Sequence, residues 1–425
     1  MSILKPAHIH VLRSTVSRGQ LLVATEIEMD ALMKAGIELH GLLEKLARAV
    51  LAGKKKIRYL VHTILNSPAA KLSALVRTIH YDVDMPPYTL TELLRRARFL
   101  FPYARIDEPV HLRLKEKDSG ELRPVMCFGW QRRALQKLCG DILKVLLPAY
   151  SFDFMEKGNG GADGAAQYLG AIIKEGQYDF VITVDIKNCF RSVNKAGIEQ
   201  LLPLPAPVTN NVLLILGDTA IRKEPPAGGE TDEHSLHTSI LEADTRQGIP
   251  QGSSVSNLFM SRAVLGPLLN ATPFADRTVL HGDDIAVAAK TATEAEAIYQ
   301  TLRSLLENDG PAGPLTIGFH KIWCVDMYVN FCKYKLRRTP KVFGAEIRYS
   351  PATRSYDRYE HNVEKIYLQA PDGEEGQQVT QYSEAWKKAF YPLWQPNELA
   401  EDMLAVTTMN AMSNAWKKKP HVKKC

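Results

Sequence analysis

The sequence predicts an α+β fold, because helical and strand patterns occupy different stretches of the chain. Between residues 24 and 80, apolar side chains recur at helical spacing and predict one buried stripe. Its members are Ile27, Leu32, Met33, Ile37, Leu42, Leu43, Leu46 and Val50. Residues 106–128 alternate apolar and polar side chains around Asp118-Ser119-Gly120, which is typical of a β-hairpin. The apolar segments FVITVDI and TVLHGDDIAVAA have the composition of buried strands.

Local signals predict further helices. Thr89 and Glu92 have the spacing of a capping box, which opens a helix at this point. The glycine-rich segment KGNGGADG leads into a helix that Asp163 is expected to cap. The last 75 residues predict a small helical subdomain built on aromatic side chains. These are Trp386, Phe390, Trp394 and Trp416.

Size and composition are those of a globular protein. The chain has 425 residues, 45% hydrophobic and 24% charged, which is enough for a large buried core. No apolar run approaches the length of a membrane span, and the N-terminus lacks the apolar stretch of a signal peptide. The six cysteines are scattered without a CxxC pair, so neither a disulfide framework nor a zinc site is expected, and a cytoplasmic location is predicted.

The net charge of +6 is a weak indication of a nucleic-acid partner. Basic residues gather in four runs, at 54–58, 95–98, 132–133 and 417–424. Each run taken singly is more often a solvated helix face than a set of phosphate contacts.

The motif HGDD, residues 281–284, lies between two apolar runs and is expected at the tip of a hairpin. A plain turn explains Gly and Asp here. Two adjacent carboxylates nevertheless repel each other unless a cation lies between them. The motif therefore stays open to both interpretations when it is taken alone.

Asp185 ends the apolar strand FVITVDI, and it can meet Asp283 if the two strand units are neighbours in one sheet. Three converging carboxylates, Asp185, Asp283 and Asp284, suit a site for two metal ions that activates a primer 3′-hydroxyl and holds a triphosphate. Oxygen ligands favour Mg²⁺, with Mn²⁺ as the alternative, over zinc.

Three segments, DIKNCFRSV, RQGIPQGSSVSNLF and HGDD, occur in this order and together resemble the central motifs of reverse transcriptases. The resemblance is greatest to prokaryotic enzymes related to group II introns, retrons and phage defence. It implies a right-hand polymerase whose palm is an antiparallel sheet flanked by helices. The implied division is a helical N-terminal extension (1–105), fingers (106–180), palm (181–350, with an insertion around 203–246) and a helical thumb with a basic tail (351–425).

The resemblance also assigns roles to residues. Asp185 and Asp283 match the metal-binding aspartates, and Asp284 matches their less directly bound neighbour. Gln251 and Gly252 match residues beneath the incoming nucleotide; Ser256 and Asn257, which follow, either contact it or cap a helix. Arg123 matches the arginine that holds the triphosphate, assisted by Lys115 or Lys117, although a surface charge on the hairpin is the alternative.

Phe190 stands where reverse transcriptases carry an aromatic residue that crowds the 2′ position of the nucleotide, which favours DNA synthesis over RNA synthesis. Lys321 matches a lysine that protonates the leaving pyrophosphate, or it is simply an exposed lysine. The hairpin that grips the primer falls at either FCKY or VFGA. His281 and Gly282 depart from the family pattern, and GDD is the usual form in RNA-dependent RNA polymerases.

The predicted function is an RNA-directed DNA polymerase that uses dNTPs with an RNA template, or a dedicated non-coding RNA, in antiphage defence. Three alternatives are kept: template-independent or protein-primed DNA synthesis, RNA-dependent RNA synthesis, and a scaffold that binds RNA without catalysis. The DNA product is a further expected partner, a membrane is not, and homo- or hetero-oligomers are both allowed. No second carboxylate cluster follows residue 350, so an attached RNase H domain is not expected.

Overall fold

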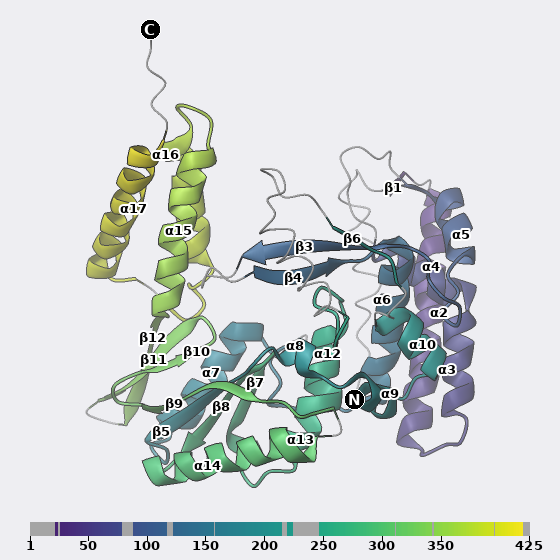
Figure 1. Ribbon diagram of the computed structural model, residues 1–425, viewed down its shortest axis with the longest axis horizontal. Helices are drawn as coiled ribbons and strands as arrows, with labels where there is room; N and C mark the ends of the chain where they lie inside the picture. The colour runs from purple at the N-terminus through teal and green to yellow at the C-terminus, as the bar shows by residue number, and fades with distance from the viewer. Residues whose placement is uncertain are drawn as a thin grey trace. The chain divides into compact units, whose positions relative to one another are not determined.

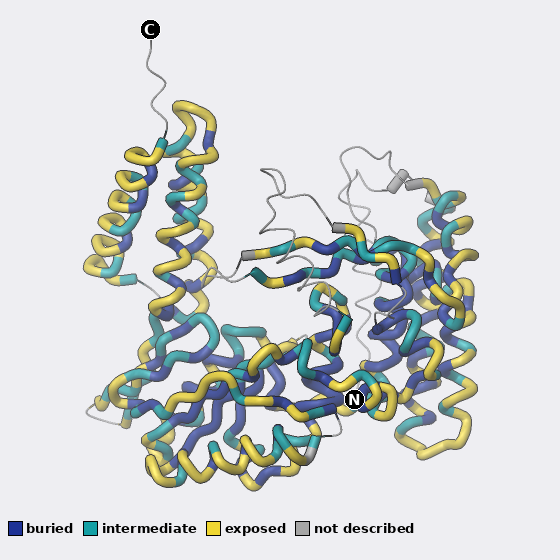
Figure 2. The backbone as a smooth tube through the Cα atoms, viewed as in Figure 1, coloured by how far each residue is buried: buried dark blue, intermediate teal, exposed yellow. Residues whose placement is uncertain are grey.

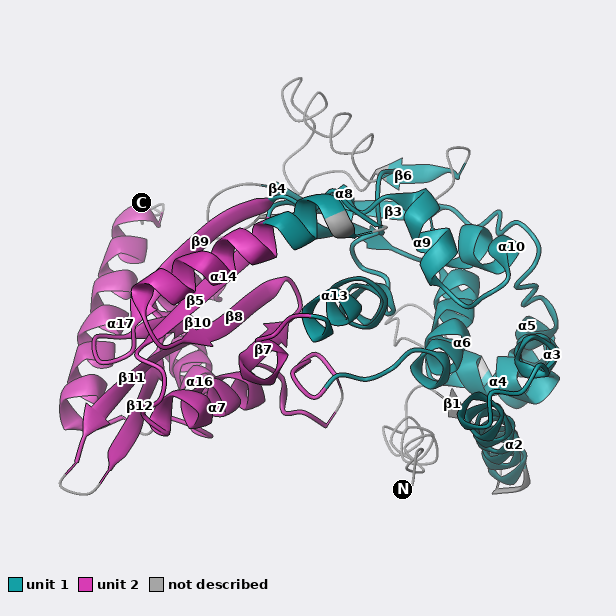
Figure 3. Cartoon of the chain, turned by 90° about the horizontal axis from the view of Figure 1, so that it is seen from below, with its two compact units in different colours: residues 1–150, 187–271, 304–316 teal, residues 151–186, 272–303, 317–425 magenta. Residues whose placement is uncertain are grey.

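A computed structural model gives the structure, with its elements labelled in Figure 1. The described residues are 22–23, 26–78, 88–116, 122–156, 158–214, 219–223, 246–310, 312–341, 344–394 and 396–419. They belong to two compact units (Figure 3). Unit 1 contains residues 1–150, 187–271 and 304–316, and unit 2 contains residues 151–186, 272–303 and 317–425. Both units combine helices with sheets, which confirms the predicted α+β class.

The first part of unit 1 is a group of packed helices. They are α2 (Glu26–Leu51), α3 (Ile57–Asn66), α4 (Pro68–Val76), α5 (Leu90–Arg98) and α6 (Trp130–Leu146). Helix α2 contacts α3, α4 and α6, and α4 contacts α5. The predicted start of α5 is confirmed, because the Thr89 side chain accepts a hydrogen bond from the main-chain N–H of Glu92. Across the described residues, no helix combines the length and apolar character needed to cross a bilayer.

The buried stripe of α2 differs from the predicted one. Leu32, Leu39, Leu43 and Leu46 are buried, whereas Ile37 is 53% exposed. Positions 32, 39, 43 and 46 follow the helical repeat of seven, four and three residues, and position 37 falls on another face of the helix. Including Ile37 in the stripe was therefore wrong, and Leu39 was missed.

A three-stranded sheet and several short helices complete unit 1. Strands β3 (Val110–Glu116) and β4 (Leu122–Cys127) form the predicted antiparallel hairpin, and β6 (Ile221–Lys223) pairs parallel with β3. The short elements are β1 (Leu22–Val23), β2 (Tyr88–Thr89), α8 (Cys189–Ser192), α9 (Lys195–Leu201), α10 (Ala206–Val208), η1 (Thr209–Leu213), α12 (Ser256–Phe259), η2 (Met260–Leu265), α13 (Gly266–Asn270) and η4 (Leu305–Asp309). Most of the predicted insertion around 203–246 lies outside the described residues.

Unit 2 is built on a four-stranded antiparallel sheet with the strand order β7-β8-β5-β9. The strands are β5 (Phe180–Ile186), β7 (Thr278–His281), β8 (Asp284–Ala289) and β9 (Ile317–Cys324). Helix α7 (Gly161–Lys174) contacts β7 and β8 and covers the face that carries Val181 and Trp323. On the opposite face, Tyr299 of α14 (Ala292–Ser304) stacks on His320. Figure 2 shows that β5 and β8 are buried along most of their length.

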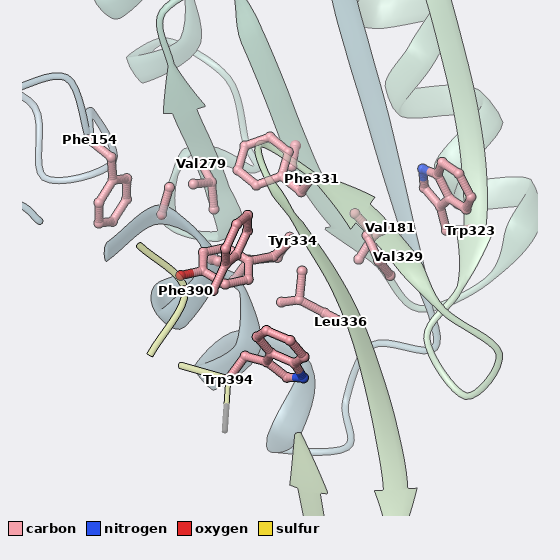
Figure 4. Close-up of a cluster of buried hydrophobic side chains, with 14 of the residues drawn as sticks. Phe154, Val181, Val279, Trp323, Val329, Phe331, Tyr334, Leu336, Phe390 and Trp394 are labelled. Atoms are coloured by element: carbon pink, nitrogen blue, oxygen red, sulfur yellow. The ribbon is translucent and has the colours of Figure 1, made fainter. Parts of the chain in front are cut away.

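The sheet core continues into the C-terminal region (Figure 4). Its elements are β10 (Val329–Phe331), β11 (Tyr334–Pro340), β12 (Ala345–Pro351), α15 (Thr353–Gln369), α16 (Glu375–Lys388) and α17 (Glu398–Lys418). Tyr334 is fully buried and packs edge-on against Phe390, beside Trp394. The predicted helical C-terminal region is confirmed, but Trp416 is 55% exposed and does not belong to its core.

The predicted helix cap at Asp163 is wrong. Helix α7 begins at Gly161, and Gly160 occupies the N-cap with a φ of 87°. Asp163 lies in the first turn, where its carboxylate accepts a 2.6 Å hydrogen bond from the Tyr334 hydroxyl and pairs with the Lys333 ammonium at 2.8 Å. Burial and this carboxylate raise the pKa of Tyr334. Asp163 therefore connects α7 to the turn between β10 and β11.

Candidate active site

The β7–β8 hairpin positions the HGDD motif. His281 ends β7 and lies directly opposite Asp284, which begins β8. Gly282 and Asp283 form the two-residue connection, and Gly282 has a φ of 70°. Such short hairpin connections require left-handed backbone conformations, which glycine adopts without strain. The motif thus folds as a tight turn that carries one carboxylate in the turn and one at the start of β8.

Strand β5 brings the third carboxylate to this turn. Asp185 pairs directly with Asp284 across β5 and β8, and residues opposite each other in an antiparallel pair project from the same face. Asp185 and Asp283 are 98 positions apart in the sequence, and the pairing of β5 with β8 brings them to the same end of the sheet. The structure thus places Asp185, Asp283 and Asp284 together at one end of the sheet of unit 2.

Electrostatics make this group unfavourable without a cation. The pKa of Asp284 is raised from 3.8 to about 6, chiefly by burial, and then by the negative charges of Asp283 and Asp185, against the opposing charge of Arg354. A divalent ion bound by these oxygens would offset that repulsion, and hard oxygen ligands suit Mg²⁺ or Mn²⁺. By chemical type the three aspartates therefore fit the predicted metal ions. Among the described residues, however, the only group of three ligand atoms within 4.8 Å of one another contains Asp284 without Asp185 or Asp283.

A histidine and a cysteine also face Asp284. The ligand atoms of His281, Asp284 and Cys332 all lie within 4.8 Å of one another, and the three side chains are half-buried. Burial lowers the pKa of His281. Cys332 lies in the turn between β10 and β11, so FCKY rather than VFGA is the hairpin turn beside the aspartates. The sequence carried no local signal for Cys332, because its partners are distant along the chain.

Lys321 has a partner other than the aspartates. It pairs opposite Thr183 on β5 and therefore projects from the same face as Asp185. Its ammonium lies 4.0 Å from the centroid of the Trp323 ring, and the Trp323 indole N–H donates a 2.8 Å hydrogen bond to the Thr183 hydroxyl. In this structure Lys321 makes a cation–π contact.

In unit 1, the PQG turn is fixed against the β3–β4 hairpin. The main-chain N–H of Met126 donates a 2.7 Å hydrogen bond to the Gln251 carbonyl. Gly252 has a φ of 107°, and a Cβ added there would stand 2.2 Å from the Met126 carbonyl oxygen. Ser256 donates its hydroxyl hydrogen to the Pro250 carbonyl at 2.8 Å, which makes it a support of the turn. The side-chain oxygen of Gln251 is buried and has no hydrogen-bond partner among the residues that the structure describes.

Phe190 is attached to the same loop through its main chain. Its carbonyl accepts a 2.8 Å hydrogen bond from the N–H of Ile249. Gly248 has a φ of 59°, and a Cβ there would stand 2.1 Å from the Phe190 carbonyl oxygen. The Phe190 side chain is half-buried rather than part of the core. Phe190, Gln251 and Gly252 are therefore neighbours within unit 1.

The predicted phosphate-binding residues lie on the hairpin of unit 1. Arg123 on β4 is directly opposite Lys115 on β3, so both side chains project from one face, and both are exposed. Lys117 lies outside the described residues. The predicted site residues thus fall into two groups, one in each unit, with the aspartates and Lys321 in unit 2.

Comparison with known proteins identifies the central part of the chain. Residues 114–321 match the family described as reverse transcriptase (RNA-dependent DNA polymerase). No curated protein sequence matches the chain.

Two solved structures are similar to it. One is a foamy viral protease–reverse transcriptase in complex with double-stranded DNA, 12% identical, covering 76% of this chain and 47% of that chain with a TM-score of 0.36. The other is telomerase from Candida albicans in complex with a fragment of telomeric RNA, 10% identical, covering 74% of this chain and 60% of that chain with a TM-score of 0.36. The chain therefore spans about half of the first structure and three fifths of the second.

The matched residues contain all three motifs, the hairpin that carries Arg123 and the sheet that joins Asp185 to Asp284. Residues 114–321, just under half of the chain, therefore resemble a reverse transcriptase domain.

Proposed function

We propose that the chain is an RNA-directed DNA polymerase that adds deoxynucleotides to a 3′-hydroxyl with the help of two divalent metal ions. The observation that carries the proposal is the pairing of Asp185 opposite Asp284, with Asp283 in the adjoining turn. Carboxylates from two separate motifs meet at one sheet end, within the residues that match the reverse transcriptase family.

Asp185, Asp283 and Asp284 would hold the ions, Mg²⁺ or Mn²⁺. When bound, such ions activate the attacking hydroxyl and stabilise the charge on the transferred phosphoryl group. The fold of the chain holds three carboxylates together on adjacent strands although they repel one another. The raised pKa of Asp284 is consistent with this, because burial and, after it, the neighbouring carboxylates disfavour the charged form of this side chain.

Residues of unit 1 would bind the nucleotide. Arg123 and Lys115 present two exposed cations side by side, which suits the oxygens of a triphosphate. The buried side-chain oxygen of Gln251 lacks a hydrogen-bond partner in the described part of the chain, and such a group costs free energy unless a ligand or water donates to it. The half-buried ring of Phe190 on the same loop would exclude a 2′-hydroxyl. Lys321 would protonate pyrophosphate only after leaving its contact with Trp323.

Primer extension on an RNA template tests the proposal. The purified chain is supplied with Mg²⁺ and either dNTPs or NTPs. We expect extension with dNTPs, and its loss in the Asp283→Asn variant, which keeps the size of the side chain and removes its charge. Extension with NTPs alone would refute the sugar assignment and favour an RNA-dependent RNA polymerase, the class for which GDD is the usual motif.

The finer part of the proposal rests on the resemblance to retron-type and phage-defence enzymes: a prokaryotic, cytoplasmic enzyme that works with a dedicated non-coding RNA, alone or in an oligomer. Sequencing the nucleic acid that co-purifies with the chain tests it. A single enriched RNA species supports a dedicated template. A product unrelated to any co-purified RNA favours template-independent or protein-primed synthesis, and full biological activity in Asp283→Asn favours a scaffold.

A further inference from the structure

We infer that His281, Asp284 and Cys332 form a binding site for Zn²⁺ that shares only Asp284 with the proposed site for Mg²⁺. Each residue offers one ligand atom, and the three atoms all lie within 4.8 Å of one another. Asp185 and Asp283 do not belong to this group. The Asp284 carboxylate therefore belongs to two groups of candidate ligands, one with the aspartate oxygens and one with the His281 nitrogen and the Cys332 sulfur.

Three separate elements fix the ligands. His281 and Asp284 face each other across the β7–β8 ladder, which sets the distance between imidazole and carboxylate. Cys332 comes from the β10–β11 turn and has a φ of 53°. In the described part of the chain, only Asn188 and Cys332 have positive φ among residues other than glycine. Left-handed backbone at such a residue is strained and is maintained by its surroundings.

The surroundings of the turn supply that support. Next to Cys332, the main-chain carbonyl of Lys333 accepts a 2.9 Å hydrogen bond from Ala352, and the Lys333 ammonium pairs with Asp163 at 2.8 Å. The following residue, Tyr334, is fully buried and donates a hydrogen bond to Asp163. The turn that carries the thiol beside Asp284 is thus held in place by contacts of the two residues that follow Cys332.

The ligand set selects the ion. Zinc is bound by imidazole nitrogen, thiolate sulfur and carboxylate oxygen at about 2.0–2.3 Å, so the ligand atoms of a tetrahedral site stand roughly 3.5 Å apart. Mg²⁺ requires oxygen ligands and discriminates against sulfur. Three protein ligands leave the fourth position of zinc open, as in exchangeable rather than closed structural sites. Zn²⁺ therefore fits this group, whereas Mg²⁺ fits the three aspartates.

Sharing of Asp284 couples the two sites. A carboxylate oxygen that ligates zinc beside His281 and Cys332 is withdrawn from the oxygen cluster. Zinc binding is therefore expected to inhibit nucleotide addition, and this consequence rests on the proposed polymerase function. The zinc site itself does not depend on that function.

Optical spectroscopy of the full-length protein with Co²⁺ in place of zinc tests the site without an activity assay. A thiolate ligand gives cobalt a charge-transfer band in the near ultraviolet, and we expect this band in the wild type and its loss on adding Zn²⁺. Cys332→Gly should abolish it, and since glycine adopts positive φ freely, this variant removes the thiol without straining the turn. Cys324→Ser, which changes a thiol of β9 in the same unit, is the matched control and should keep the band.

A second measurement uses His281→Phe, which keeps a ring of similar size but removes the nitrogen ligand. We expect its Co²⁺ affinity to fall by about tenfold or more. No band in the wild type, a band that survives Cys332→Gly, or a band lost in Cys324→Ser would each overturn the site.

Zinc titration of primer extension at saturating Mg²⁺ then tests the coupling. Each variant is compared with its own rate without zinc. We expect the zinc concentration for half inhibition to rise about tenfold or more in Cys332→Gly, and to stay unchanged in Cys324→Ser. Equal inhibition of Cys332→Gly and the wild type would overturn the coupling. If the protein shows the cobalt band but no polymerase activity, the proposed function is refuted and the proposed zinc site is still supported.

Discussion

Replacing Asp284 by asparagine is expected to stabilise the metal-free protein while abolishing nucleotide addition. Burial and the neighbouring carboxylates raise the pKa of Asp284 from its ordinary value of 3.8 to about 6. A folded-state pKa above the unfolded value means that the charged carboxylate opposes folding. The resulting loss of folding stability is absent below about pH 4, increases between pH 4 and 6, and reaches its full size above pH 6.

The magnitude follows from the pKa. A rise from 3.8 to about 6 corresponds to about 3 kcal/mol at 25 °C, which is the largest gain expected for Asp284→Asn at neutral pH. Urea denaturation in EDTA, at pH 7.5 and again at pH 5, measures it. The difference in free energy of unfolding between Asp284→Asn and the wild type should be smaller at pH 5 than at pH 7.5. Adding Mg²⁺ at pH 7.5 should also reduce this difference, because the ion stabilises only the wild type.

Asp357→Asn is the matched control, because Asp357 is an exposed aspartate of α15. It should change the free energy of unfolding little at either pH. If Asp284→Asn were no more stable than the wild type at pH 7.5, or if its advantage were the same at pH 5, the electrostatic account of the aspartate cluster would be refuted.

Three other substitutions probe separate features. Gly252→Ala should lower the free energy of unfolding by about 2 kcal/mol or more, since it adds a methyl group against a main-chain carbonyl at positive φ. The control Gly376→Ala places its methyl group in open space on α16 and should not destabilise the protein, and thermal denaturation of both variants tests this. Phe190→Ala should raise the NTP-to-dNTP incorporation ratio by about tenfold or more, and an unchanged ratio would remove Phe190 from sugar selection. Arg77→Met should cost about 2–3 kcal/mol, because it removes the guanidinium from the buried 2.6 Å ion pair with Asp141, although Lys137 remains 3.7 Å from that carboxylate. A loss below about 1 kcal/mol in urea denaturation would contradict this.

Features set by neighbouring residues could be predicted from the sequence. The alternation around Asp118-Ser119-Gly120 predicted the β3–β4 hairpin, and the apolar runs on both sides of HGDD predicted the β7–β8 turn. The meeting of Asp185 with the HGDD turn could also be anticipated, because adjacent strands in a sheet bring their ends together. In each case a pattern within a short stretch of the chain, either alternation or an apolar run, carries the information.

Features set by distant contacts could not be predicted. Asp163 has the sequence context of a helix cap, but Tyr334 and Lys333 determine where its carboxylate points. Cys332 meets Asp284 only because the β10–β11 turn folds back to the sheet, which no local pattern records. Trp416 is apolar and lies on a helix, yet whether a helix face is covered depends on which other elements pack there.

The loop at 248–252 has a consequence for engineering. Main-chain hydrogen bonds connect it to Phe190 and to β4, and glycines stand at both points of closest approach. The ring at position 190 can accordingly be exchanged for other side chains while its scaffold stays in place. If Phe190 excludes the 2′-hydroxyl as proposed, substitutions at this one position would change which sugars are accepted.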